Sequence, residues 1–79
     1  MSDKAFAKVL RQLRTEKGLS QEDFGFAADL HRTYVSQLER GLKSPSLKTL
    51  RKIAIVLDIT LTNLIALVEQ ETNVQSDGH

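Results

Sequence analysis

Residues 20–41 constrain the fold of this chain more than any other stretch, because they combine two short helical segments with a tight turn. Ser20 is placed to cap the first segment, with Asp23 at the capping-box spacing. Gly25 lies midway along that segment, where a second helix can cross closely, and Asp29 follows where the chain must turn. We therefore expect two helices that pack across a tight turn, which is the arrangement of a helix-turn-helix motif.

Apolar residues recur at helical spacing along the whole chain, and no stretch alternates as a strand would. The spacing predicts five helices, over about 3–17, 20–28, 32–40, 46–57 and 60–71. The residues expected to face the core are Phe6, Val9, Leu10, Leu13, Val35, Leu38, Leu47, Leu50, Ile53, Ala54, Leu57, Leu61, Leu64, Ile65 and Val68. Gly18 and Gly41 are placed to end the first and third helices. We expect an all-α, compact five-helix domain over residues 1–71 and a disordered polar tail over residues 72–79.

The composition argues against several classes of protein. A chain of 79 residues can form one domain with a modest core. Without cysteine it has neither a disulfide framework nor a thiolate metal site. No apolar run reaches the length of a membrane span or follows the charged start of a signal peptide. His31 and His79 have no neighbouring set of catalytic or metal-ligating residues, and no glycine-rich phosphate loop is present. We therefore expect a cytoplasmic protein that is not an enzyme and uses neither a metal nor a cofactor.

The formal net charge of +1 hides a polarised distribution of charge along the chain. Residues 1–31 carry five basic and five acidic side chains. The next stretch, to residue 52, has Glu39 as its single acid and six basic side chains, which are Arg32, Arg40, Lys43, Lys48, Arg51 and Lys52. Residues 53–79 carry only acids, which are Asp58, Glu69, Glu71 and Asp77. A basic middle segment is typical of a polyanion-binding face, and we expect the acidic end to point away from it. The alternative is a chance clustering of solvated surface charge.

Several segments resemble one known family at the mutual spacing that the family shows. The segments are Gly18-Leu19-Ser20-Gln21-Glu22, Tyr34-Val35-Ser36, Leu38-Glu39-Arg40-Gly41 and Pro45-Ser46-Leu47-Lys48-Thr49-Leu50. Together they resemble the Cro and phage-repressor type (XRE-family) helix-turn-helix domain, over roughly residues 5–68. The run from His31 to Tyr34 is also similar to the start of the recognition helix in controller proteins of restriction-modification systems.

In that family the third helix enters the major groove, so the resemblance implies base contacts from its outward residues near the N-terminus. Those residues are Arg32, Thr33, Ser36 and Gln37. Their chemistry suits the role, because Arg pairs with guanine, Gln pairs with adenine and the Thr methyl packs on thymine. The resemblance also implies contacts to the DNA backbone from Gln21, Tyr34, Arg40, Lys43 and Ser44. For Arg32 the alternative is a phosphate contact, and for Tyr34 it is packing over the turn.

Four further positions matter in the comparison with the family. Arg14 and Glu39 match residues that form an ion pair in some phage repressors, so we expect a pair that links the first helix to the end of the third. Asp29 stands where the family usually has Gly, and Asp tolerates the left-handed conformation better than most residues. His31 replaces the usual Ser or Thr at the cap of the third helix. The hypotheses for its ring are capping, a phosphate contact when protonated, and simple solvation.

Some apolar residues exceed what the core of one protomer needs. Phe26, Ile55 and Leu67 fall off the inward faces of their helices. We expect a homodimer whose interface lies on the two C-terminal helices, with contacts from Ile55, Leu61, Leu64, Leu67 and Val68. Such a dimer would present two recognition helices about 34 Å apart to a palindromic operator. The alternative is that the assumed helical phase is wrong by one residue, so that Phe26, Ile55 and Leu67 are ordinary core.

The sequence thus predicts a sequence-specific transcriptional regulator that binds double-stranded DNA as a homodimer. We expect no membrane association and, since nothing follows the fifth helix, no small-molecule effector. Repression, possibly of its own gene, is the expected sign of regulation, because occupying a promoter suffices for it. One alternative is a restriction-modification controller protein with activating and repressing activity. Another is an antitoxin or adaptor that uses the same fold to bind protein, although that role would not need four outward polar side chains beside a cationic loop.

Overall fold

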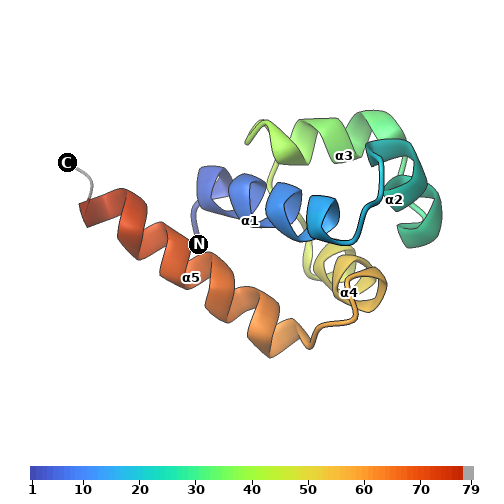
Figure 1. Cartoon of the computed structure of the whole chain (residues 1–79). Helices are drawn as coiled ribbons and strands as arrows, with labels where there is room; N and C mark the ends of the chain where they lie inside the picture. Colours follow the sequence, from blue (N-terminus) through green and yellow to red (C-terminus); the bar gives the residue numbers. More distant parts are fainter. Residues whose placement is uncertain (78–79) are drawn as a thin grey trace.

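The computed structural model describes residues 1–77 and, within them, five α-helices and no strand (Figure 1). The helices are α1 (Asp3–Glu16), α2 (Gln21–Ala28), α3 (Arg32–Glu39), α4 (Leu47–Val56) and α5 (Leu61–Asp77). α1 packs against α3 and α5, while α4 packs against α2 and α5. α3 and α5 therefore lie on opposite sides of the molecule (Figure 1). The expected all-α fold class is confirmed, with a helix in each expected segment.

Polar side chains determine where the helices begin. At each start, a side-chain atom accepts a hydrogen bond from a backbone N–H of the first turn, over 3.0 to 3.1 Å. The capping residues are Ser2, Ser20, His31, Ser46 and Thr60. Gly18 and Gly41 follow α1 and α3 with φ of 73° and 72°, which confirms the expected left-handed ends. Because each cap pairs an N–H that the helix itself leaves free, the local sequence fixes the start of these short helices.

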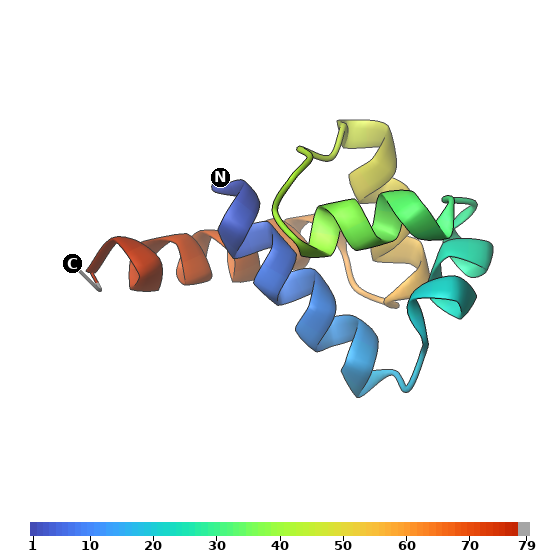
Figure 2. The same cartoon turned by 90° about the horizontal axis from the view of Figure 1, so that it is seen from above.

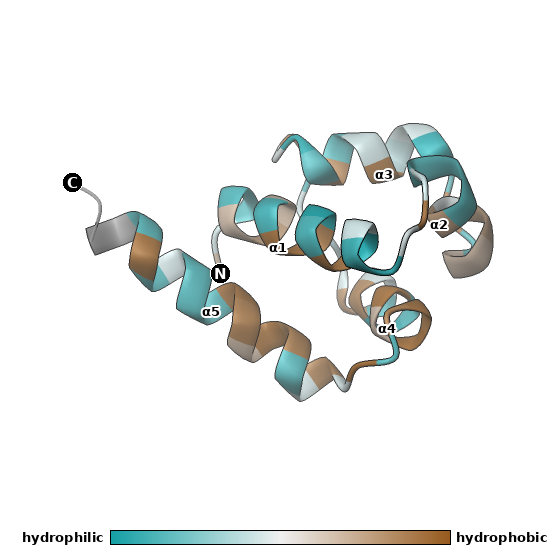
Figure 3. Ribbon diagram, viewed as in Figure 1, coloured by the Kyte–Doolittle hydropathy of each residue, from teal (hydrophilic) through white to brown (hydrophobic). Residues whose placement is uncertain are grey.

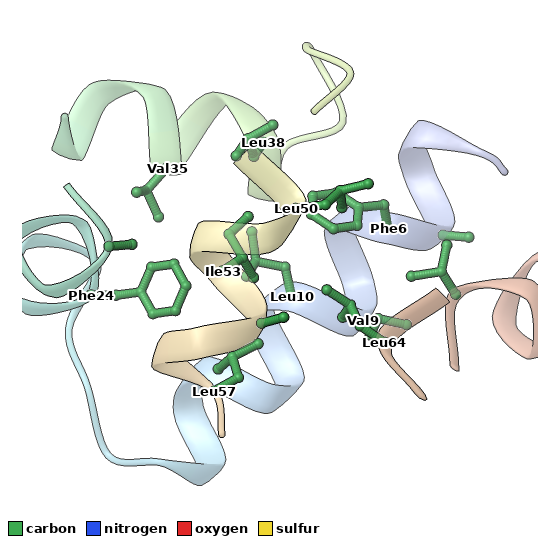
Figure 4. Packing of buried hydrophobic residues seen from close by; sticks show 14 residues of the cluster. Phe6, Val9, Leu10, Phe24, Val35, Leu38, Leu50, Ile53, Leu57 and Leu64 are labelled. Carbon is green, nitrogen blue, oxygen red and sulfur yellow. The ribbon is translucent and has the colours of Figure 1, made fainter. Parts of the chain in front are cut away.

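The core is apolar and draws on all five helices (Figure 4). Its largest fully buried side chains are Phe6, Leu10, Phe24, Val35, Leu38, Ile53, Leu64 and Val68. Phe24 is a core residue that the helical pattern did not single out, whereas Leu13, Leu61 and Ile65 are half-buried at the edge of the core. The expectation for Leu47 is wrong, because its side chain is 56% exposed. Leu47 is the first residue of α4, and the buried residues of that helix begin at Thr49.

α5 is longer than the sequence suggested. It runs to Asp77, so the expected end near residue 71 is wrong, and so is the expected disordered tail for residues 72–77. Residues 78 and 79 lie outside the described residues. Two contacts lie near the start of the added segment: Lys8 on α1 donates to the Glu71 carboxylate over 3.3 Å, and the Thr72 hydroxyl donates to the Val68 carbonyl over 2.8 Å. The added segment therefore continues from a part of α5 that an ion pair connects to α1.

Polarity and shape differ between the two sides of the molecule. Hydrophilic residues predominate along α3, whereas α4 and the first half of α5 are largely apolar (Figure 3). Seen from above, the C-terminal end of α5 extends beyond the other helices (Figure 2).

Over the described residues, no single helix is long and apolar enough to cross a bilayer. Only α4 and α5 taken together meet that test, across a bend of 103°.

Candidate nucleic-acid interface

The outer face of α3 carries the side chains that the sequence assigns to base contacts. Val35 and Leu38 are fully buried, and they hold the inner face of the helix against the core (Figure 4). The outer set comprises Arg32 and Thr33, which are exposed, and Ser36 and Gln37, which are half-buried. Because Ser36 and Gln37 follow Arg32 and Thr33 by four residues, about one helical turn, the four positions share one side of the helix. α3 therefore presents a compact polar surface of a size that the major groove admits.

The turn before α3 depends on a close approach of two backbones. A Cβ atom at Gly25 would lie 2.6 Å from the carbonyl oxygen of Leu30, so a larger residue fits only if the turn moves. The backbone N–H of Leu30 also donates to the Gly25 carbonyl over 2.7 Å. Asp29 ends α2 in the left-handed conformation, with φ 56° and ψ 46°, as expected. These contacts fix the angle at which α3 leaves α2.

His31 caps α3, which confirms the first of the three hypotheses for its ring. Nδ1 accepts a hydrogen bond from the backbone N–H of Thr33 over 3.1 Å. A nitrogen that accepts a hydrogen bond carries no proton, so the proton of the neutral ring is on Nε2. His31 therefore takes the place of the usual Ser or Thr and sets the first residue of α3 at Arg32.

A buried ion pair fastens α1 to the end of α3, as expected. Arg14 Nε and Nη2 donate to the two carboxylate oxygens of Glu39 over 2.6 and 2.9 Å, and the two side chains are only 11% and 3% exposed. This hydrogen bonding raises the pKa of Arg14 above its ordinary value, although burial opposes the shift.

The same ion pair reaches α2 and the loop before it. Gln21 Nε2, on the first residue of α2, donates to Glu39 over 3.2 Å. Arg14 Nη1 donates to the Leu19 carbonyl over 2.7 Å. A single carboxylate therefore joins three helices, α1, α2 and α3, around the polar surface.

Sequence reasoning missed the partner of Arg32. Its Nη1 donates to the carboxylate of Glu22 over 2.9 Å, and the two side chains are 65% and 71% exposed. An exposed pair of this kind contributes under about 1 kcal/mol, so a base or a phosphate can replace Glu22 at little cost. The two residues lie on different helices, and no spacing rule within one helix would have paired them. The pair keeps the Arg32 side chain close to the N-terminus of α2.

The residues expected at the DNA backbone occupy several environments. Gln21 already has Glu39 as a partner for its side chain, while its backbone lies in the first turn of α2. Tyr34 is half-buried and packs against the core, which agrees with the alternative that its ring packs over the turn. Arg40 and Lys43 are exposed just beyond α3. Ser44 is less available than expected, because its hydroxyl donates to the Asp3 carboxylate over 2.6 Å.

The residues expected in a dimer interface divide by exposure. Ile55 is 79% exposed and Phe26 is 91% exposed, so the alternative that both are ordinary core is wrong. Leu61 and Leu67 are half-buried and pack against the core. Leu64 and Val68 are fully buried within the protomer, so neither can meet a partner, and their assignment to the interface is corrected. Both were misplaced because α5 turns this face toward α1 rather than outward.

Two open grooves border α3, and most of the residues that line them carry polar or charged side chains. One lies at the N-terminus of α2 and is lined by Arg14, Ser20, Gln21, Glu22 and Arg32. The other lies between α1 and the end of α3. Within residues 1–77, no three His, Cys, Asp or Glu side chains come together as metal ligands would. The arrangement of side chains around α3 therefore favours contact with a polyanion.

A short helix of outward polar side chains, set by a tight turn after α2 and fastened by a buried ion pair, defines the helix-turn-helix class of nucleic-acid-binding domain. The family model described as "Helix-turn-helix" matches residues 10–64. The chain belongs to that family, and the resemblance to its phage-repressor (XRE) type is confirmed.

Known proteins match the chain over most of its length. It is 46% identical over 67 residues to the control protein C.MunI of Mycoplasma sp, across 84% of this chain and 90% of that relative. The crystal structure of the restriction-modification controller protein C.AhdI from Aeromonas hydrophila has 45% identity and a TM-score of 0.75, across 78% of this chain and 90% of that one. A second controller protein, C.Esp1396I, was solved as a tetramer with its natural 35 base-pair operator. It matches with 29% identity and a TM-score of 0.79, across 87% of this chain and 91% of that one.

Proposed function

We propose that this chain is a sequence-specific DNA-binding transcriptional regulator. The observation that carries the proposal is the outer face of α3, where four polar side chains lie together while the inner face of the same helix is buried in the core. The four residues are Arg32, Thr33, Ser36 and Gln37. These side chains can form hydrogen bonds with base edges, and the exposed Arg40 and Lys43 can contact phosphates beside them. The activity is binding rather than catalysis. Because the ligand is DNA, the proposed location is the cytoplasm.

The binding unit that we propose is a homodimer. Ile55 leaves a large apolar side chain in solvent on α4, which a second copy can cover. Two-fold symmetry would place two α3 helices about 34 Å apart, which is the repeat of the major groove along one face of a duplex. The matching operator is a palindrome with half-sites about one helical turn apart.

The finer proposal is a controller protein of a restriction-modification system. Two proteins that share 46% and 45% identity with this chain carry the names of control or controller proteins, and this supports the assignment. The run from His31 to Tyr34, which begins with the cap of α3, supports it from the sequence. A regulator of this kind would repress by occupying a promoter, its own included, and would also have activating activity.

The experiment that tests the proposal is selection of bound duplexes from a random DNA pool at near-physiological salt, followed by sequencing. We expect a palindrome with half-sites about ten base pairs apart. The matched control is Arg32→Ala/Gln37→Ala, which removes two outward side chains and leaves the buried face of α3 intact. It should fold and enrich no motif. A folded wild-type protein that enriches no motif would contradict the proposal and favour an antitoxin or adaptor that binds protein.

A further inference from the structure

A basic groove runs between α1 and the end of α3. We name it the α1 groove, and its cationic lining consists of Lys4, Lys8 and Arg11 from α1 and Arg40 from the end of α3. The floor is narrow where Gly41 approaches α1, because a Cβ atom there would lie 3.6 Å from the Lys4 Cα. The other α1 residues along the groove are Ala7, Gln12 and Thr15. The lining therefore contains no apolar side chain larger than alanine.

Most of the positive charge in the α1 groove is uncompensated. Among the described residues, Lys4, Arg11 and Arg40 have no carboxylate within 4.0 Å. Lys8 lies 3.3 Å from Glu71, yet 62% of its side chain remains exposed. Glu39 also borders the groove, but Arg14 already pairs with both of its carboxylate oxygens. The distribution of charge along the sequence did not indicate this surface, because residues 1–31 carry as many acidic as basic side chains and their net charge is zero.

The spacing of the cations matches a nucleic-acid backbone. Lys4, Lys8 and Arg11 follow at i, i+4 and i+7, which places them on one side of α1. From first to last they span about 10 Å, at about 1.5 Å of rise per residue. Successive phosphates of one DNA strand advance by about 3.4 Å along the axis and also wind around it, so a stripe of this length can face roughly two to three of them. The carbon that the groove exposes belongs to alanine and to the stems of its long side chains, and it holds no aromatic or large aliphatic side chain of the kind that anchors a protein partner.

The α1 groove lies next to the surface that we assign to DNA, with the Arg14–Glu39 pair between the two grooves. Glu39 borders the α1 groove, Arg14 borders the groove at the N-terminus of α2, and the two residues form the buried ion pair. Arg40 immediately follows α3. We infer that the α1 groove holds the phosphodiester backbone of duplex DNA just outside the half-site that α3 contacts. This inference rests on the proposed function, and it assigns to α1 a share of affinity that depends on the length of the duplex and not on its sequence.

The test uses two duplexes that carry the selected operator, one trimmed at the edges of the half-sites and one with unrelated flanking sequence. The variant is Lys4→Gln/Arg11→Gln, which changes two exposed side chains. The wild-type protein should bind the flanked duplex more tightly than the trimmed one, and the variant should lose that difference. Each phosphate contact contributes about 0.9 to the slope of log K against log salt, so the slope on the flanked duplex should become shallower by about 2.

The matched control is Asn63→Asp/Gln70→Glu, which lowers the net charge by the same two units on exposed positions of α5. It should keep the preference for the flanked duplex. Arg40→Gln changes the other wall of the groove; because Arg40 also belongs to the proposed contacts within the half-site, this variant should weaken binding to both duplexes and lose more on the flanked one. The inference is overturned if Lys4→Gln/Arg11→Gln, folded by circular dichroism, keeps the wild-type preference and salt slope. The inference is also overturned if the control variant loses as much of the preference for the flanked duplex as Lys4→Gln/Arg11→Gln does. A wild-type protein that binds neither duplex contradicts the proposed function itself, and the two failures are thereby distinguished.

Discussion

Two carboxylates near α3 accept hydrogen bonds from arginines in very different surroundings. Glu39 is buried and shared between Arg14 and Gln21, whereas Glu22 meets Arg32 in solvent. Glu39→Ala would leave the charge of Arg14 without a partner inside the protein, and we expect it to lower the free energy of unfolding by about 3–5 kcal/mol. Glu22→Ala should cost under about 1 kcal/mol. Urea unfolding of both variants measures the difference, and equal losses would contradict the structural role of Glu39.

Two cations of the interface should differ in how they affect specificity. Arg32→Ala should cost roughly 1–3 kcal/mol of binding free energy on the selected operator and relax the preference at one position of each half-site. Lys43→Ala should weaken binding to all sequences alike and make the salt dependence shallower, as expected of a phosphate contact. Titrations against the operator and its single-base variants separate the two effects. If Arg32→Ala weakened every sequence equally, Arg32 would be a phosphate contact instead.

At the scale of secondary-structure elements, the crossing of α2 and α3 depends on Gly25. In Gly25→Ala the added methyl group would meet the Leu30 carbonyl oxygen at 2.6 Å, so the turn must shift. We expect a loss of about 1–3 kcal/mol in the free energy of unfolding and a further loss of DNA affinity, because α3 changes its angle. Gly18→Ala is the matched control. Its φ of 73° also strains alanine, but nothing lies within 4 Å and the turn is remote from the crossing. Unchanged affinity in a folded Gly25→Ala variant would disprove the coupling.

The elements that sequence predicted well are those fixed by local chemistry. Ser20, His31 and Ser46 cap helices within a few residues of themselves, and the left-handed turn at Asp29 is equally local. The predictions that were wrong concern features that depend on contacts between segments distant in the sequence. Lys8 on α1 contacts α5 at Glu71, where the sequence predicted the helix to end, and the exposure of Leu47 depends on where the core stops.

The candidate site divides in the same way. The four outward residues of α3 follow from helical periodicity and from the resemblance to the family. The partner of Arg32 and the cations of the α1 groove come together only when helices pack. Glu22 lies on α2, and Lys4 and Arg11 lie on α1, far in sequence from the end of α3. No pattern within one helix reports such a surface.

At the scale of the whole molecule, the proposed dimer interface centres on Ile55, an exposed side chain of α4. Ile55→Glu places a charge where we propose that a second copy packs, so the sedimentation coefficient should fall toward that of a monomer. The free energy of unfolding within the protomer should change little, because Ile55 is 79% exposed. Phe26→Glu is the control, since Phe26 lies on α2, outside the proposed interface. A protein that remains dimeric with Ile55→Glu would place the interface elsewhere.

The whole chain contains a single tyrosine and no tryptophan, and that tyrosine, Tyr34, is half-buried on α3. Light absorbed in the tyrosine band is therefore emitted from the proposed recognition helix and from no other part of the protein. The intrinsic tyrosine fluorescence therefore reports on the proposed DNA interface without an added label. Stopped-flow mixing with an operator duplex could follow the arrival of DNA at α3 on unmodified protein, and the same signal would record the loss of α3 during unfolding.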